Sequence, residues 1–134
     1  MKTQKNKYTG KFVVAFDTIV EGTQCFKDDK GQPLLFDSYD EAYTEMFDDN
    51  LSMLESHAES GDLEELNEGV TPALVKKMRK AYDSKEVKAM EKFMNKHKNC
   101  NDAGTWVEKA EDFILGRKAI FTGNGVKITG KKLD

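Results

Sequence analysis

The fold is decided by residues 38–61, which read SYDEAYTEMFDDNLSMLESHAESG. An α-helix turns by about 100° per residue, and at that step the apolar side chains of this stretch fall on one face and the acidic ones on the other. Ser38 followed by Glu41 forms a capping box, which satisfies free backbone N–H groups at a helix start. Gly61 is a natural C-terminal stop. The stretch therefore predicts a long amphipathic helix.

Working outward from this helix, strand patterns appear on both sides of it. Runs of apolar residues bounded by turn residues predict short strands. They are expected at residues 11–20, 23–26, 33–36, 119–122 and 126–129. Gly123-Asn124-Gly125 separates the last two runs, and Asn-Gly in that position is a strong hairpin signal.

Further helices are expected between the two groups of strands. Thr71-Pro72 combines a capping hydroxyl with a proline in the first turn, which favours a helix start. The apolar face then changes direction near Asp83-Ser84, so we predict a break there, with Ser84 capping a second helix to about Lys98. Trp106, Val107, Ala110, Phe113 and Ile114 share one helical face, which predicts a last helix ending at Gly116. This order of strands and helices along the chain predicts an α+β fold. About four helices are expected to pack on a small, largely antiparallel sheet built from the N-terminal strands and the C-terminal hairpin.

Length and composition indicate one domain. The chain has 134 residues, of which 38% are apolar and 34% charged, and its 8 Phe, 4 Tyr and 6 Met are enough for one core. We expect residues 1–10 to form a flexible basic tail and residues 11–134 a single α+β domain. No apolar run approaches the roughly 20 residues of a membrane span, so no membrane partner is expected. Without an export signal, Cys25 and Cys100 are expected to be reduced thiols in a cytoplasm.

The charges are strongly segregated along the chain. Residues 37–69 contain 12 acidic residues and no Lys or Arg, whereas residues 76–98 contain 9 basic and 3 acidic residues. The predicted acidic face consists of Glu41, Glu45, Asp48, Glu55 and Glu59. The basic helix pair 72–98 carries Lys76, Arg79, Lys80, Lys85, Lys88, Lys92 and Lys96. Two interpretations without a binding function stay open. The charged residues could simply form the solvated faces of amphipathic helices, or the acidic and basic faces could neutralise each other.

A few residues could carry chemistry. His57 and Asn50 fall on the apolar face of the long helix, where they are either hydrogen-bonded core residues or part of a site. His97 and Cys100 have H-x-x-C spacing and, with Cys25 and His57, would supply the residue types of a zinc site. The spacing of Cys25 and His57 matches no zinc framework, so no metal is expected. No catalytic or cofactor motif is present, so we name no catalytic residue and expect no cofactor.

One pentapeptide resembles a known docking motif. Gln32, Leu35 and Phe36 match the peptide by which bacterial proteins bind the replication sliding clamp, whereas Pro33 and Leu34 depart from it. We interpret these residues as a core strand.

The leading functional hypothesis is a non-enzymatic interaction protein, an inhibitor or adaptor, that uses the acidic helix to bind a protein partner with a basic surface. In its general character the chain is similar to accessory proteins of phages and mobile elements. The alternative is a nucleic-acid-binding module using the basic helix pair. An enzyme of unrecognised type, with Asp17, His57 or Tyr43 in a pocket, is the third.

Overall fold

The computed structural model describes residues 8–20, 22–115, 117–122 and 125–132, and from residue 115 onward it describes the backbone alone. The chain divides into two compact units, one formed by residues 1–42 and 105–134 and the other by residues 43–104. The α+β class is confirmed, since a small antiparallel sheet and five α-helices are present in the described part. The predicted tail over residues 1–10 falls largely outside the described residues.

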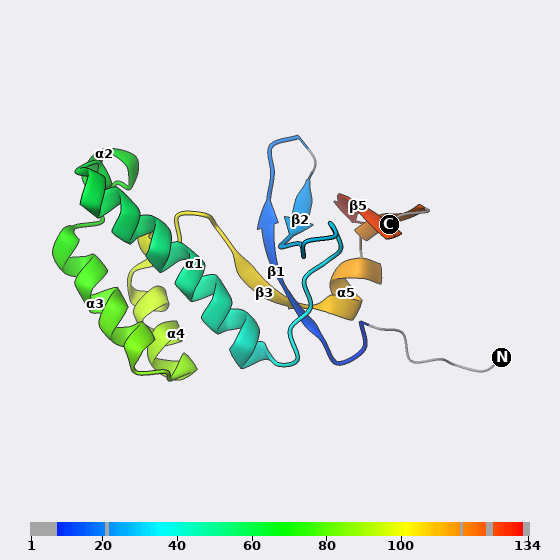
Figure 1. Ribbon diagram of the computed structural model, residues 1–134, viewed down its shortest axis with the longest axis horizontal. Helices are drawn as coiled ribbons and strands as arrows, with labels where there is room; N and C mark the ends of the chain where they lie inside the picture. Colours follow the sequence, from blue (N-terminus) through cyan, green and yellow to red (C-terminus); the bar gives the residue numbers. More distant parts are fainter. Residues whose placement is uncertain (1–7, 21, 116, 123–124, 133–134) are drawn as a thin grey trace. The chain divides into compact units, whose positions relative to one another are not determined.

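The first unit is built around the strand β1 (Phe12–Asp17). This strand lies between β2 (Thr23–Cys25) and β3 (Trp106–Lys109) and pairs antiparallel with both (Figure 1). Side chains alternate across a strand, so Val13 and Ala15 share one face of β1. Together with the short helix α5 (Ala110–Leu115) they form a core. Its buried members are Tyr8, Val13, Ala15, Cys25, Ala110, Phe113 and Ile114.

The predicted last helix was wrong in its first half. Residues 106–109 form the edge strand β3, in which Val107 opposes Val14, and the helix begins only at Ala110. The backbone N–H of Ala110 donates a hydrogen bond to the carbonyl of Lys11 at 2.8 Å, where the ladder ends. Trp106 and Val107 suit a pleated strand as well as a helix face, and pairing with β1 decides between the two.

The predicted C-terminal hairpin is confirmed in the backbone. Strands β4 (Arg117–Thr122) and β5 (Gly125–Lys132) pair antiparallel, while the turn residues Gly123 and Asn124 lie outside the described part. The two strands form a sheet of their own and do not add to the β2-β1-β3 sheet.

Two further strand boundaries differ from prediction. β1 ends at Asp17, so Ile19 and Val20, expected on the strand, instead lie fully exposed in the turn before β2. Residues 33–36 make only isolated bridges, between Pro33 and Lys27 and between Phe36 and Phe12.

The regular elements of the second unit are all helices. Its longest element, α1 (Tyr39–Ser60), begins in the first unit and enters the second at Tyr43. It is followed by α2 (Leu63–Leu66), α3 (Pro72–Asp83), α4 (Val87–Lys96) and the 3₁₀ turn η1 (Lys98–Cys100). Figure 1 shows α3 and α4 running beside α1. No helix in the described residues is both long and apolar enough to cross a membrane.

The predicted signals at both ends of α1 and at the start of α3 are confirmed, whereas the predicted cap of α4 is not. The hydroxyl of Ser38 accepts a hydrogen bond from the backbone N–H of Glu41 at 3.1 Å, and Gly61 has a positive φ of 83° after the last turn of α1. The hydroxyl of Thr71 accepts one from Leu74 at 3.2 Å at the start of α3. The break after Asp83 is confirmed, but Glu86 occupies the cap position of α4 that we assigned to Ser84.

Candidate functional site

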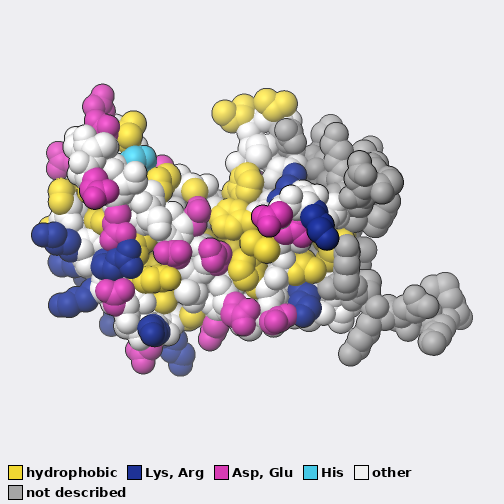
Figure 2. All heavy atoms as spheres, in the orientation of Figure 1, with side chains coloured by type: hydrophobic (Ala, Val, Ile, Leu, Met, Phe, Trp, Pro, Cys, Tyr) yellow, Lys and Arg dark blue, Asp and Glu magenta, His cyan; other side chains and the backbone are white. Residues whose placement is uncertain are grey.

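The acidic face of α1 is the first candidate surface. Glu41, Glu45 and Glu59 are exposed, and Asp48 and Glu55 are half-buried. Successive members stand three, four or seven residues apart, so they form one row along the helix. Figure 2 shows acidic side chains along α1 and basic ones over α3 and α4.

Asp49 extends this row and was missed by the sequence analysis. Its side chain is exposed, and its pKa is raised, first by partial burial and second by the charge of Asp48. Asp49 directly follows Asp48 in the sequence, and this adjacency could have identified it as part of the acidic face. An approaching positive charge would favour the charged form of Asp49 and offset its repulsion by Asp48.

Glu55 differs from the rest of the row because it is already neutralised. The guanidinium of Arg79 on α3 donates two hydrogen bonds to its carboxylate, at 2.9 Å from Nε and 2.5 Å from Nη2. Asp83 lies 3.6 Å from another nitrogen of the same guanidinium. These contacts raise the pKa of Arg79, with the hydrogen bond to Glu55 as the main cause. The acidic and basic faces thus neutralise each other at this point, and neither residue is a free contact for a partner.

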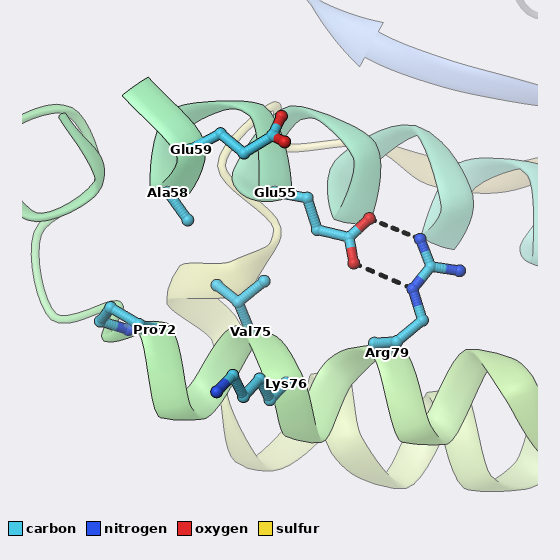
Figure 3. Close-up of a pocket in the computed structure, with 7 residues that line it drawn as sticks. All are labelled: Glu55, Ala58, Glu59, Pro72, Val75, Lys76 and Arg79. Atoms are coloured by element: carbon cyan, nitrogen blue, oxygen red, sulfur yellow. Dashed lines mark hydrogen bonds and ion pairs between the residues drawn. The ribbon is translucent and has the colours of Figure 1, made fainter. Parts of the chain in front are cut away.

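An open groove lies between α1 and α3 beside this ion pair. It has a volume of about 540 Å³. Figure 3 shows its lining, which consists of Glu55, Ala58, Glu59, Pro72, Val75, Lys76 and Arg79. The bidentate pair closes one end, while Glu59 and Lys76 belong to its two walls (Figure 3). The sequence named the charged residues here but gave no sign that α1 and α3 would enclose a space.

The basic residues of α3 and α4 form the second candidate surface. Apart from Arg79, the predicted members are all exposed, namely Lys76, Lys80, Lys85, Lys88, Lys92 and Lys96. Within the described residues, none of these six lysines lies in an ion pair. Lys77 is also exposed on α3 and was not among the predicted residues. Lys85 occupies the turn between the helices with a positive φ of 62°.

Asn50 is a structural residue of the second unit. It is fully buried, and its Nδ2 donates to the carbonyl of Met46 and to Oδ1 of Asn101, each at 3.1 Å. Its Oδ1 accepts from the backbone N–H of Ala103 at 3.3 Å. The side chain therefore ties α1 to the segment that follows η1.

His57 is half-buried, and its ring contacts the side chain of Asn67. Its Nδ1 lies 2.6 Å from Oδ1 of Asn67, which is buried after α2. This contact ties the last turn of α1 to the end of α2. Neither His57 nor Tyr43 lines the groove between α1 and α3.

The remaining candidates for chemistry give no site. Cys25 and Cys100 are free and buried, and burial raises the pKa of the Cys25 thiol to about 12 and that of Cys100 to about 11. A thiol that stays protonated is a poor nucleophile and a poor metal ligand. Among the residues that the structure describes, no three His, Cys, Asp or Glu side chains gather as a metal site would require. Asp17 is exposed, and its carboxylate accepts a hydrogen bond from Thr23 at 2.7 Å.

The pentapeptide at residues 32–36 is built into the first unit. Pro33 is buried, and Leu35 is partly buried against the core. Phe36 exchanges two backbone hydrogen bonds with Phe12. A docking peptide needs these side chains free, so the interpretation as part of the fold is favoured.

No protein-family model, curated protein or solved structure matches this chain.

Proposed function

We propose that the protein is a non-enzymatic interaction protein, an inhibitor or adaptor, that binds a partner protein through the acidic face of α1. The observation that carries the proposal is the row of carboxylates without cationic partners. Glu41, Glu45, Asp48, Asp49 and Glu59 lie in no ion pair with another described residue. Opposite charge on a partner would steer association and select against neutral or acidic surfaces.

The partner is therefore a protein with a basic surface, of the kind that nucleic-acid-binding proteins carry. Glu55 is left out of the contact, because Arg79 already occupies its carboxylate. The cytoplasm is the proposed setting, since the free thiols of Cys25 and Cys100 suit a reducing compartment.

The test is retention of cell-lysate proteins on the immobilised chain after nuclease treatment. The double reversal Glu45→Lys with Asp48→Lys should abolish retention of a specific protein, whereas the wild type keeps it at moderate salt. The matched control is Glu64→Lys with Glu65→Lys, which changes the net charge equally at two exposed positions on α2. Equal retention by the wild type and both variants would show that the acidic face is not the contact.

A second candidate, nucleic-acid binding by α3 and α4, is favoured by the six exposed lysines, which form no ion pair with any residue that the structure describes. Lysines that neutralise phosphates make binding steeply dependent on salt. In the same experiment, this function predicts that lysate proteins are retained only through nucleic acid, so that nuclease treatment removes them. The double variant Lys88→Glu with Lys92→Glu should also lose this retention. The acidic-face variant would leave that retention intact.

A further inference from the structure

The groove between α1 and α3 has the dimensions of a binding site and an apolar floor. Its volume of about 540 Å³ falls within the range of roughly 300–1,000 Å³ that is typical of ligand sites. In Figure 3, Ala58 on α1 and Val75 on α3 point into the space between the helices, with Pro72 beside them. Val75 is buried and Ala58 is small, so the floor is apolar and leaves room for a larger side chain.

The two walls of the groove differ in charge. Glu59 lies on the α1 wall and Lys76 on the α3 wall, and neither has an ion-pair partner among the described residues. Glu55 and Arg79 close one end but neutralise each other. A ligand that fits would therefore place positive charge toward α1, negative charge toward α3, and an apolar group between them.

The walls are two antiparallel helices. Glu55 meets Arg79, while Phe47, two turns earlier on α1, stacks on Tyr82, which comes later on α3. A third helix packs well against such a pair, because its ridge of side chains fits the groove between them. Residues 43–104 are all described and contain no strand, so they offer no sheet edge to which an extended peptide could add.

We propose that this groove receives one amphipathic helix of a partner protein, with an apolar stripe bordered by a basic flank and an acidic flank. The proposal rests on the proposed function and extends it, since it states the secondary structure and side-chain pattern of the segment that binds. A large apolar side chain of that helix occupies the space above Ala58 and Val75. A basic residue on one flank pairs with Glu59, and an acidic residue on the other flank pairs with Lys76. Opposite charges beside an apolar seam set the orientation of helix pairs in this way.

The test uses a synthetic helical peptide with a leucine stripe, an arginine flank and a glutamate flank. It is titrated into the ¹⁵N-labelled full chain while the backbone amide signals are followed. We expect shifts at Ala58, Glu59 and Val75 that saturate with one peptide per chain. A control peptide with serine in place of the leucines should give no saturable shift, because the apolar contact is lost.

Two protein variants locate the peptide. Ala58→Leu fills the floor and should weaken binding on the order of tenfold, as removal of a central contact does. Glu59→Lys changes only an exposed wall residue and should weaken binding by about threefold at low salt. Glu65→Lys, an exposed reversal outside the groove, is the matched control and should leave the affinity unchanged. If the Ala58→Leu variant does not fold, the loss of peptide affinity in the Glu59→Lys variant still tests the proposal.

The outcomes separate this proposal from the proposed function. Peptide binding that is indifferent to both Ala58→Leu and Glu59→Lys, or no shift in the groove at all, overturns the helix-in-groove proposal. The proposed function is judged independently by the Glu45 and Asp48 reversal. If N-acetyl-leucine amide shifts the same signals as strongly as the peptide, the groove is a small-molecule site and the proposal is wrong.

Discussion

The side chain of Asn50 shows how one buried polar residue connects distant parts of the helical unit. Asn50→Ala would leave the N–H of Ala103 without its acceptor and open a small cavity. We expect the free energy of unfolding to fall by about 2–3 kcal/mol. Urea denaturation measures this, with Asn95→Ala as a control because Asn95 is exposed on α4. Equal stability of the two variants would contradict the structural role of Asn50.

Residue-scale features were partly predictable from the sequence. Asn50 and His57 stood out because they interrupt an apolar helix face, and the alternative of hydrogen-bonded core residues is supported for Asn50. The pairing of Glu55 with Arg79 was not predictable, since the sequence shows two charged faces but not which members meet. That contact depends on how α1 packs against α3. The residue pattern of one helix does not show how it packs against another.

At the scale of elements, the start of α3 depends on one hydroxyl. Thr71 accepts the hydrogen bond from the N–H of Leu74, and α3 carries one wall of the groove. Thr71→Ala should lower the free energy of unfolding by about 1 kcal/mol, because an N–H in the first turn loses its acceptor. Thr71→Ser keeps the hydroxyl and should retain most of the stability. Urea denaturation of both variants tests this, and equal losses would show that the methyl group matters and the cap does not.

Elements with strong local signals were predicted well, and those that depend on distant pairing were not. The ends of α1 and the start of α3 follow from caps within a few residues. Strand β3 follows from pairing with β1, which is far away in the sequence, and its residues also fit a helical face. For the same reason, the sequence predicted the β4–β5 hairpin from its own turn but could not show that it forms a separate sheet.

For the whole molecule, the two buried thiols predict sensitivity to alkali. Folding raises the pKa of Cys25 to about 12 and of Cys100 to about 11, from an ordinary value of 9.0. Above pH 9 the unfolded chain releases these protons while the folded chain keeps them, so stability falls as pH rises. Each thiol contributes a slope of up to about 1.4 kcal/mol per pH unit. Burial likewise raises the pKa of Tyr43, to about 12 from 10.0, which adds to the loss above pH 10.

Unfolding free energies measured from pH 8 to pH 10 should therefore decline above pH 9. The double variant Cys25→Ala with Cys100→Ala should decline less steeply, because it lacks both thiols. Identical slopes for the variant and the wild type would show that the thiols are not the cause.

The division of the chain into units also has a consequence for its synthesis. Residues 43–104 are continuous, whereas the other unit needs residues from both sides of them. A ribosome releases the chain from its N-terminus, so all residues of the helical unit emerge before β3 does. Strand β1 is made much earlier, yet it must wait for β3, its partner on one side, until the whole helical unit has followed it out. During that interval Val13 and Ala15 of β1 lack Ala110, Phe113 and Ile114, with which they share a core in the folded protein. An apolar segment without its core partners is what a chaperone would bind at this stage.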